Sequence, residues 1–128
     1  MIYALITARK NSKGIKNKNL LKIKNKSLFQ ISIDNAKKAK IFDKIFCSTD
    51  SNVMIDIAKK NLVHTIRRPK YLSGDKTPSY DVIINFFEFL KKNNIKKPIL
   101  LFLFQPTSPN IKPETIKQML KVYKKNKK

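Results

Sequence analysis

The sequence contains few of the residues on which several common structural devices depend. Only one of its 128 residues is a cysteine, Cys47, so the chain cannot form an internal disulfide, and this usage favours a reducing, cytoplasmic setting. No apolar run approaches the ~18 residues that a membrane-spanning helix needs. The amino terminus begins directly with an apolar strand-like run, without the basic segment that precedes the apolar part of a secretory signal. We therefore expect neither secretion nor a membrane partner.

Glycine, histidine and acidic residues are also scarce. The 2 glycines, Gly14 and Gly74, cannot supply a phosphate loop with the G-x-x-x-x-G-K-[ST] spacing. The single histidine, His64, has no second histidine or cysteine near it in sequence, which favours a structural role over metal binding. The 8 acidic residues form no close pair near the expected binding edge, so we predict no metal site within the chain. Asp50 remains open to two interpretations, a place near a metal or a helix cap.

Lysine dominates the charge of the chain. Lys and Arg number 29 against 8 Asp and Glu, a net charge of +21, which ordinarily suggests nucleic acid or an anionic surface as a partner. Only Arg9, Arg67 and Arg68 are arginines, whereas base-reading and phosphate-gripping surfaces favour arginine forks. The aromatic residues lie mostly in apolar stripes, not between cations. We attribute most of the charge to a compositional bias and disfavour nucleic acid as a partner.

Strand-like apolar runs alternate with helix-like periodicities along the whole chain. We expect four strands, at 2–6, 44–47, 63–66 and 99–104, and four helices, at 27–39, 51–61, 79–93 and from 113 onward. This order predicts a single α/β domain over residues 1–128, with a Rossmann-like three-layer α/β/α architecture and a mostly parallel sheet in the order 3-2-1-4. The unbroken apolar run 99–104 is typical of a strand that is buried on both faces.

This topology brings particular loops together. Strands one and four are neighbours in the expected sheet, so the loops that follow them, 7–19 and 105–112, face each other at the carboxyl edge, where open α/β sheets bind ligands. The long connection 67–78 ends at the same edge. Loop 7–19 contains five cations, small polar side chains and Gly14, a composition that suits a phosphate site. A plain solvated basic loop is the competing interpretation.

Six short motifs occur in order along the chain. They are Ala8-Arg9-x-Asn11-Ser12-Lys13-Gly14, Lys18-Asn19, Ser48-Thr49-Asp50, Arg68-Pro69, Gly74-Asp75-Lys76-Thr77-Pro78-Ser79 and Gln105-Pro106-Thr107-Ser108-Pro109. In this order and spacing they resemble the acylneuraminate cytidylyltransferases, a family of CMP-sialic acid synthetases with legionaminate and pseudaminate relatives. The last motif is similar to the sialate branch and not to the 3-deoxy-manno-octulosonate branch.

The resemblance implies a nucleotide-diphospho-sugar transferase type of fold and a transferase activity. CMP would pass from CTP to a nine-carbon 2-keto sugar acid (N-acetylneuraminate, legionaminate or pseudaminate) with release of pyrophosphate and with Mg²⁺ as cofactor. It also implies a cytoplasmic role in cell-surface polysaccharide biosynthesis and homodimeric full-length relatives. Family members run well over 200 residues, so the chain resembles only their amino-terminal nucleotide-binding part, with the Mg²⁺ ligands mainly outside it. A non-catalytic nucleotide-binding module is the alternative, and a basic nucleic-acid-binding domain is a more remote one.

The resemblance also implies roles for individual residues. Arg9 and Lys13 would grip the triphosphate and offset the charge that develops as pyrophosphate leaves, which makes them the expected catalytic pair. Lys18 would be a further phosphate cation, and Asn19 would bond the ribose or a phosphate. The complete expected nucleotide site adds Ser12 and Gly14 in the same loop, Arg68, Ser79 and Gln105 around cytosine and ribose, and the backbones of Thr7 and Ala8 at the base edge.

Overall fold

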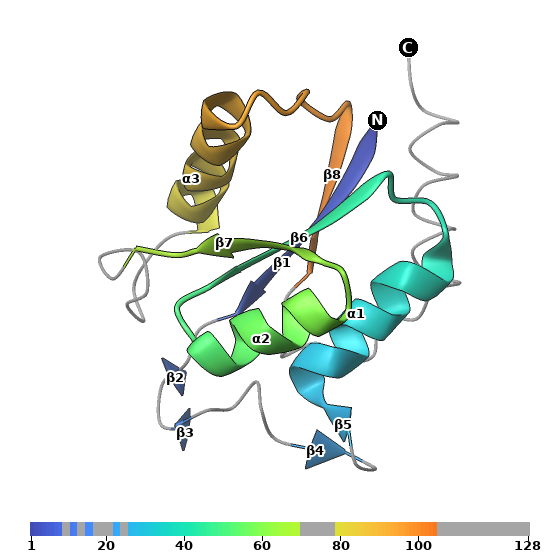
Figure 1. Ribbon diagram of the computed structural model, residues 1–128, viewed down its shortest axis with the longest axis vertical. Helices are drawn as coiled ribbons and strands as arrows, with labels where there is room; N and C mark the ends of the chain where they lie inside the picture. The colour runs from blue at the N-terminus through green and yellow to red at the C-terminus, as the bar shows by residue number, and fades with distance from the viewer. Residues whose placement is uncertain (9–10, 13–14, 17–21, 24–25, 70–78, 105–128) are drawn as a thin grey trace.

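A computed structural model describes residues 1–8, 11–12, 15–16, 22–23, 26–69 and 79–104 of the chain (Figure 1). Three helices and four longer strands alternate along these residues, with four two-residue strands between the first strand and the first helix. In chain order the elements are β1 (Ile2–Ala8), β2 (Asn11–Ser12), β3 (Ile15–Lys16), β4 (Lys22–Ile23), β5 (Lys26–Ser27), α1 (Leu28–Ala39), β6 (Lys44–Thr49), α2 (Asn52–Lys60), β7 (His64–Arg67), α3 (Ser79–Lys92) and β8 (Leu100–Phe104).

The four longer strands form one parallel sheet in the order β7-β6-β1-β8, which confirms the predicted order 3-2-1-4. At the carboxyl edge Ala8 lies opposite Thr49, and Thr49 lies opposite Arg67. On the other side of β1, Ile6 lies opposite Phe104, so β8 ends near the same edge. Because all four strands run the same way, their carboxyl ends lie at one edge of the sheet.

Two apolar cores, one on each face of the sheet, confirm the three-layer architecture. On one face Ala4 and Ile6 of β1 pack with Phe29 of α1 and Met54 of α2. On the other face Tyr3, Leu5, Phe46 and Ile66 pack with Phe86 and Leu90 of α3. Alternate residues of β1 therefore serve different cores, as the pleat of a strand requires. Figure 1 shows α1 and α2 together on one side of the sheet and α3 on the other.

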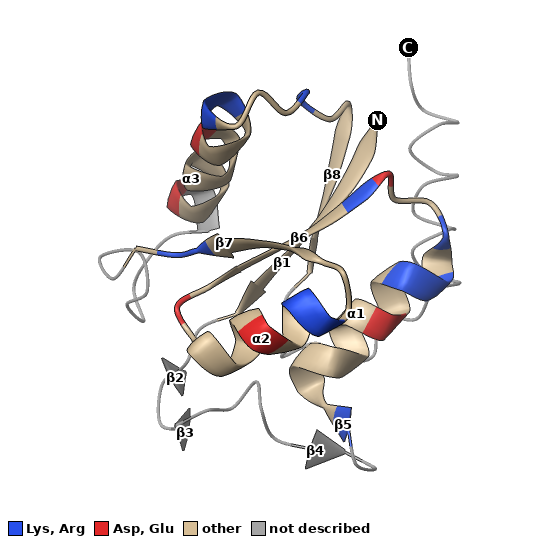
Figure 2. Cartoon of the chain, viewed as in Figure 1, with Lys and Arg blue, Asp and Glu red and all other residues tan. Residues whose placement is uncertain are grey.

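The helix boundaries follow from capping residues and charges. The Ser27 hydroxyl accepts a hydrogen bond from the Gln30 backbone N–H (3.0 Å), and α1 ends where Lys40 takes a φ of 54°. The last turns of α1, α2 and α3 each contain two lysines, at 37–38, 59–60 and 91–92. Figure 2 shows these cations at the carboxyl ends of the helices, where they complement the helix dipole. Part of the lysine excess therefore has a structural use.

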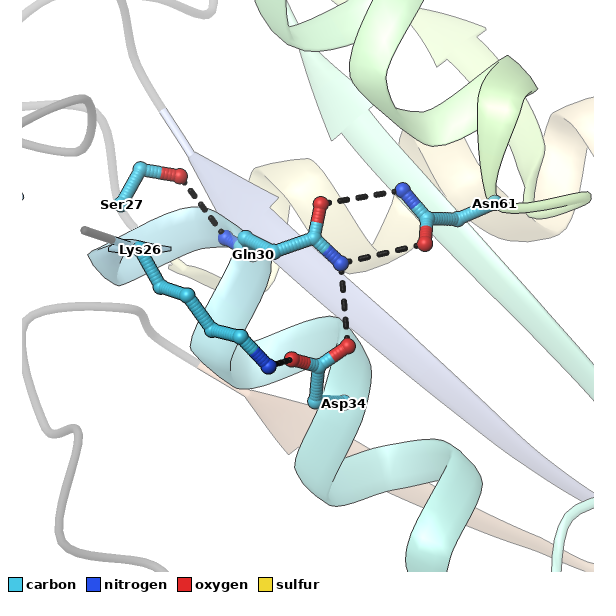
Figure 3. A network of polar contacts seen from close by, with 5 residues as sticks. All are labelled: Lys26, Ser27, Gln30, Asp34 and Asn61. Carbon is cyan, nitrogen blue, oxygen red and sulfur yellow. Dashed lines mark hydrogen bonds and ion pairs between the residues drawn. The ribbon is translucent and has the colours of Figure 1, made fainter. Parts of the chain in front are cut away.

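A polar network joins α1 to the end of α2 (Figure 3). The side-chain amides of Gln30 and Asn61 exchange two hydrogen bonds, of 3.1 and 3.0 Å. Gln30 also donates to the Asp34 carboxylate (3.0 Å), which receives a second bond from Lys26 (2.9 Å). Partial burial alone would raise the pKa of Asp34, but the bonds from Lys26 and Gln30 and the charges of Lys26 and Lys38 bring this pKa below its usual value.

Three features differ from the sequence-based expectation. Strands β1 and β6 each continue two residues further than predicted, because Thr7 and Ala8 pair with Ser48 and Thr49. The predicted loop 7–19 contains the short antiparallel pair β2–β3, and a second pair, β4–β5, lies between that loop and α1. Strand β8 was expected to be buried on both faces, but residues 100–103 are only partly buried because β8 is the last strand of the described sheet. The helix predicted from 113 onward lies outside the described residues.

Candidate functional site

The candidate site lies where the carboxyl ends of β1, β6 and β7 meet. Thr7 is opposite Ser48, and Ser48 is opposite Ile66, so these three residues share one row across the sheet. The ladder continues one residue beyond β7, because the Arg68 N–H donates to the Thr49 carbonyl (2.9 Å). Parallel strands thus place residues from three distant parts of the sequence at one edge.

The face that these residues occupy is the one covered by α3. Tyr3 and Leu5 contribute to the α3 core, and Thr7 is the next residue in the same alternation. In β6 the α3 core contains Phe46, so Ser48 follows on that face too. Helix α3 begins at Ser79 and ends near the opposite edge, where the Tyr3 hydroxyl donates to the Lys96 carbonyl (2.7 Å). The amino end of α3 therefore points toward the edge that contains Thr7 and Ser48.

Among the described residues, Arg68 is the charged residue that is buried at this edge. Its side chain is 5% exposed, and its Nε donates to the Ser48 hydroxyl at 3.4 Å while its Nη2 donates to the Ser48 carbonyl at 3.3 Å. A buried cation is stable only where polar groups face it. Ser48, which is 1% exposed, supplies two such groups. The guanidinium is thus held over the end of β6, on the α3 face.

The positive charge of Arg68 also acts on the neighbouring thiol of Cys47. Cys47 is buried in the other core, and this burial raises its pKa from 9.0 to about 12, while the positive charge of Arg68 opposes part of the rise. A thiol with such a pKa stays protonated near neutral pH and is a poor nucleophile. Cys47 is therefore a small core residue, and it does not contribute to chemistry at the edge.

The turn after β6 is built by hydroxyl groups on the other face. The Thr49 hydroxyl accepts a hydrogen bond from the Ser51 N–H (3.1 Å) and contacts the Met54 sulfur (3.7 Å). The Ser51 hydroxyl accepts from the Met54 N–H (3.2 Å), so Ser51 is the N-cap of α2. The N-cap of α2 is thus Ser51 and not Asp50, for which a helix cap was one of the two interpretations. Asp50 stands between these two anchored residues, at the end of β6.

The structure brings four of the predicted site residues to this edge. Thr7 and Ala8 end β1, Arg68 follows β7, and the α3 backbone begins at Ser79. Ser12 lies in β2, paired with Ile15. The remaining predicted site residues lie outside the described residues: Arg9, Lys13, Gly14, Lys18, Asn19 and Gln105. Arg9 and Gln105 directly follow the described ends of β1 and β8 in the chain.

The contacts of Arg67 and His64 are structural ones. Arg67 is exposed and donates from Nη2 to the Asn52 side chain of α2. His64 lies with its ring 5.2 Å from that of Phe46 and is exposed. Within the ranges that the structure describes, no group of three or more histidine, cysteine, aspartate or glutamate side chains is arranged to hold a metal ion. No helix in those ranges is long and apolar enough to cross a membrane.

Sequence reasoning did not assign a role to the Ser48 side chain. It noted Ser48 only as part of the Ser48-Thr49-Asp50 motif. The signal that could have revealed more was the alternation in β6, where Phe46 and Ser48 must lie on one face and Cys47 and Thr49 on the other. A serine that follows a core aromatic on the same face needs a polar partner, and Arg68 is that partner here.

Comparison with known proteins now places the chain in a family. A family profile described as cytidylyltransferase matches residues 3–128. The chain is 35% identical over 124 residues to an N-acylneuraminate cytidylyltransferase of Escherichia coli and 32% identical over 123 residues to a pseudaminic acid cytidylyltransferase of Campylobacter jejuni. Each match covers 95% of this chain, but only 28% of the first protein and 53% of the second.

Solved structures agree with the fold. A CMP:2-keto-3-deoxy-manno-octonic acid synthetase complexed with CTP superposes with a TM-score of 0.76 at 19% identity, covering 98% of this chain and 48% of that one. A cytidylyltransferase from Leptospira borgpetersenii superposes with a TM-score of 0.73 at 21% identity, covering 98% and 50%. The chain thus spans about half or less of the proteins it matches. The profile match over nearly the whole sequence and the shared fold show that this chain belongs to the cytidylyltransferase family.

Proposed function

We propose that this chain is the nucleotide-binding part of an enzyme that transfers CMP from CTP to a sialic-acid-like nine-carbon 2-keto acid. One observation carries the proposal: the carboxyl edge of the sheet holds a buried guanidinium, Arg68, over the end of β6, and β6 pairs with the end of β1, which the motif residues Arg9 to Asn19 follow in the sequence. Family membership supports the transfer of a cytidylyl group, and the names of the sialic and pseudaminic acid relatives support the acceptor class.

The proposed reaction makes limited demands on the protein. The anomeric hydroxyl oxygen of the acceptor attacks the α-phosphorus of CTP, the bond from that phosphorus to the bridging oxygen breaks, and pyrophosphate leaves with the bonding electrons. The hydroxyl proton passes to solvent or to a base. Positioning and charge neutralisation supply most of the catalysis in such a displacement. We assign the neutralisation to Arg9 and Lys13, because Arg9 follows the last residue of β1 directly and Lys13 belongs to the same basic segment.

The selectivity for cytidine is assigned to the other residues of the edge. Arg68, Ser79 and Gln105 line cytosine and ribose in this proposal, with the backbones of Thr7 and Ala8 at the base edge. An arginine suits this role because its planar fork both stacks and donates to acceptors in fixed directions. Arg68 is already held at the end of β6, on the face toward which the start of α3 points.

The described residues do not fit a protein-built Mg²⁺ site. Mg²⁺ demands near-octahedral oxygen ligands, usually one or two carboxylates with phosphates and water, and the described part of the chain groups no such carboxylates. We propose that Mg²⁺ enters with the nucleotide and that its carboxylate ligands come mainly from outside this chain. A structural neighbour from Mycobacterium tuberculosis was solved as a manganese complex, which is compatible with a divalent ion in this fold. The reducing setting indicated by the single cysteine supports a cytoplasmic place for this chemistry.

Thermal unfolding with nucleotides tests the proposal. We expect CTP with Mg²⁺ to raise the melting temperature of the chain more than ATP with Mg²⁺ at the same concentration, because a ligand stabilises the folded state according to its affinity. Arg68→Ala should remove most of the difference between the two nucleotides. The matched control is Arg67→Ala, one residue away, which is exposed and faces α2. Equal shifts with CTP and ATP in the unaltered chain would show plain charge attraction and would refute the proposal.

A further inference from the structure

Ser48 is a polar side chain in a place that sheets normally fill with apolar ones. It lies in β6, between β1 and β7, and is 1% exposed. On its own face the preceding residue of the alternation, Phe46, is fully buried in the α3 core. A buried hydroxyl without a hydrogen bond destabilises a fold, so such a residue has to be matched with a polar group.

Arg68 supplies this polar group, and its guanidinium donates two hydrogen bonds to Ser48. The Ser48 hydroxyl accepts from Nε at 3.4 Å, and the Ser48 carbonyl accepts from Nη2 at 3.3 Å. A guanidinium is planar, so two contacts at different nitrogens fix both its position and the orientation of its plane. The Arg68 backbone is fixed as well, through the bond from its N–H to the Thr49 carbonyl (2.9 Å).

The other side chains near the end of β6 make their contacts on the opposite face of the sheet. Thr49 contacts Met54 and accepts from the Ser51 N–H on the α2 side. Cys47 belongs to the core of that same side. Among the side chains at the end of β6, that of Ser48 is therefore the one that bonds to Arg68 on the α3 face.

We propose that Ser48 is a positioning residue that orients the Arg68 guanidinium for nucleotide selectivity at the carboxyl edge. The inference rests on the proposed function, in which Arg68 lines the cytosine and ribose pocket. Ser48 does not touch the nucleotide in this account. It restricts the long Arg68 side chain to one arrangement before the ligand arrives, which reduces the conformational freedom lost on binding.

Binding of CTP and ATP, each with Mg²⁺, to the full chain tests this role by titration calorimetry. Ser48→Ala removes the hydroxyl but keeps the carbonyl, so CTP affinity should fall about three- to tenfold while ATP affinity changes little. Arg68→Ala should lower CTP affinity by roughly 10- to 100-fold. Adding Ser48→Ala to Arg68→Ala should cost nothing more, because Ser48 acts only through Arg68. Ser48→Thr keeps a hydroxyl and should retain most of the selectivity.

A matched control separates positioning from loss of packing. Ser32 is another buried serine, in α1 on the opposite face of the sheet, so Ser32→Ala reports the effect of removing a buried hydroxyl from this domain. It should leave the ratio of CTP to ATP affinity unchanged even if it lowers the melting temperature. Circular dichroism confirms that each variant is folded at the temperature of the titration.

The possible failures are distinguishable. If the unaltered chain binds CTP and ATP equally, the proposed function fails, and the inference fails with it. If CTP binds selectively and Arg68→Ala weakens it, but Ser48→Ala acts equally in both backgrounds or leaves selectivity intact, the proposed function stands and the role of Ser48 is overturned. Loss of selectivity in Ser48→Thr as severe as in Ser48→Ala would also overturn it, because the hydroxyl would then not be the determining group.

Discussion

The amide pair between Gln30 and Asn61 should contribute measurably to the stability of the α1–α2 layer (Figure 3). The two side chains lie 31 positions apart in the sequence and exchange hydrogen bonds of 3.1 and 3.0 Å. A neutral hydrogen bond contributes about 0.5–1.5 kcal/mol net, and this pair is partly exposed, so the coupling between the two residues should be about 1–2 kcal/mol.

The single substitutions should cost different amounts. Asn61→Ala also removes the bond from its side-chain nitrogen to the Ile57 carbonyl (2.8 Å), so it should destabilise the fold by about 1.5–3 kcal/mol. Gln30→Ala removes the bond to Asp34 as well (3.0 Å). The lowered pKa of Asp34 gives stability that is present above the ordinary pKa of a carboxyl group and is lost as the pH falls through the pKa of the folded state. Gln30→Ala removes one cause of the lowered pKa, so it should also reduce the loss of stability below about pH 4.

Urea unfolding followed by circular dichroism provides the free energies for a double-mutant cycle. Asn93 supplies a matched control, because its side chain makes the same kind of bond to a carbonyl four residues earlier, that of Phe89 (2.9 Å), at the end of α3. Gln30→Ala and Asn93→Ala should be additive. A Gln30–Asn61 coupling within about 0.3 kcal/mol of zero, no larger than the error expected for independent sites, would refute the reasoning.

Three further predictions concern the core, the basic loop and catalysis. Burial raises the Cys47 pKa to about 12, so the stability that the neutral thiol contributes is complete below pH 9 and is lost at higher pH. In urea titrations, Cys47→Ala should therefore reduce the decline in the free energy of unfolding between pH 8 and 10.5 by about 2 kcal/mol. An unchanged decline would contradict this. Arg9→Ala should weaken CTP binding by about 1.5–3 kcal/mol in calorimetry at fixed salt, the range for a bond to a charged group, whereas Lys10→Ala should cost little; equal losses would mean that the loop acts as diffuse charge. In a pyrophosphate-release assay with CTP, Mg²⁺ and N-acetylneuraminate, the 128-residue chain should turn over poorly or not at all, because its described residues group no carboxylates for Mg²⁺; rapid turnover by the pure chain would overturn this account of the metal.

Much of the fold was predictable because local and global signals agree in this sequence. The alternation of apolar runs and helical stripes located the four longer strands and three helices, and the rules for parallel connections then yielded the order β7-β6-β1-β8. Strand ends were less predictable. Thr7, Ala8, Ser48 and Thr49 follow the strongly apolar runs that marked the two strands, yet they continue the ladder that their neighbours form.

The short antiparallel pairs β2–β3 and β4–β5 were not predicted, because the sequence signal for them is weak. Strands β2 and β3 are separated by Lys13-Gly14, and two-residue connections favour Asn-Gly or Asp-Gly, so the glycine alone was a weak signal. The partial burial of β8 was also missed. Its apolar composition resembles that of a central strand, but the number of neighbours a strand has is a property of the sheet and not of the strand.

The candidate site was predictable in its location but not in its internal contacts. Parallel topology alone places Thr7, Ala8 and Arg68 at one edge. The bonds from Arg68 to Ser48 depend on which face each side chain takes at the end of its strand, and on a rotamer of a long side chain, neither of which composition specifies. The assignment of all these residues to a nucleotide site stays a prediction, and six of them lie outside the described residues.

The location of nucleotide binding can be measured directly by titrating isotope-labelled chain with CTP and Mg²⁺ and recording backbone amide shifts. The account predicts the largest changes at the carboxyl edge, in Thr7, Ala8, Ser48 and Arg68, with little change at the opposite edge around Lys40 and Lys96. ATP at the same concentration should produce smaller changes in the same residues. Changes concentrated on the lysine-rich helix ends, or spread evenly over the surface, would contradict a nucleotide site at the carboxyl edge.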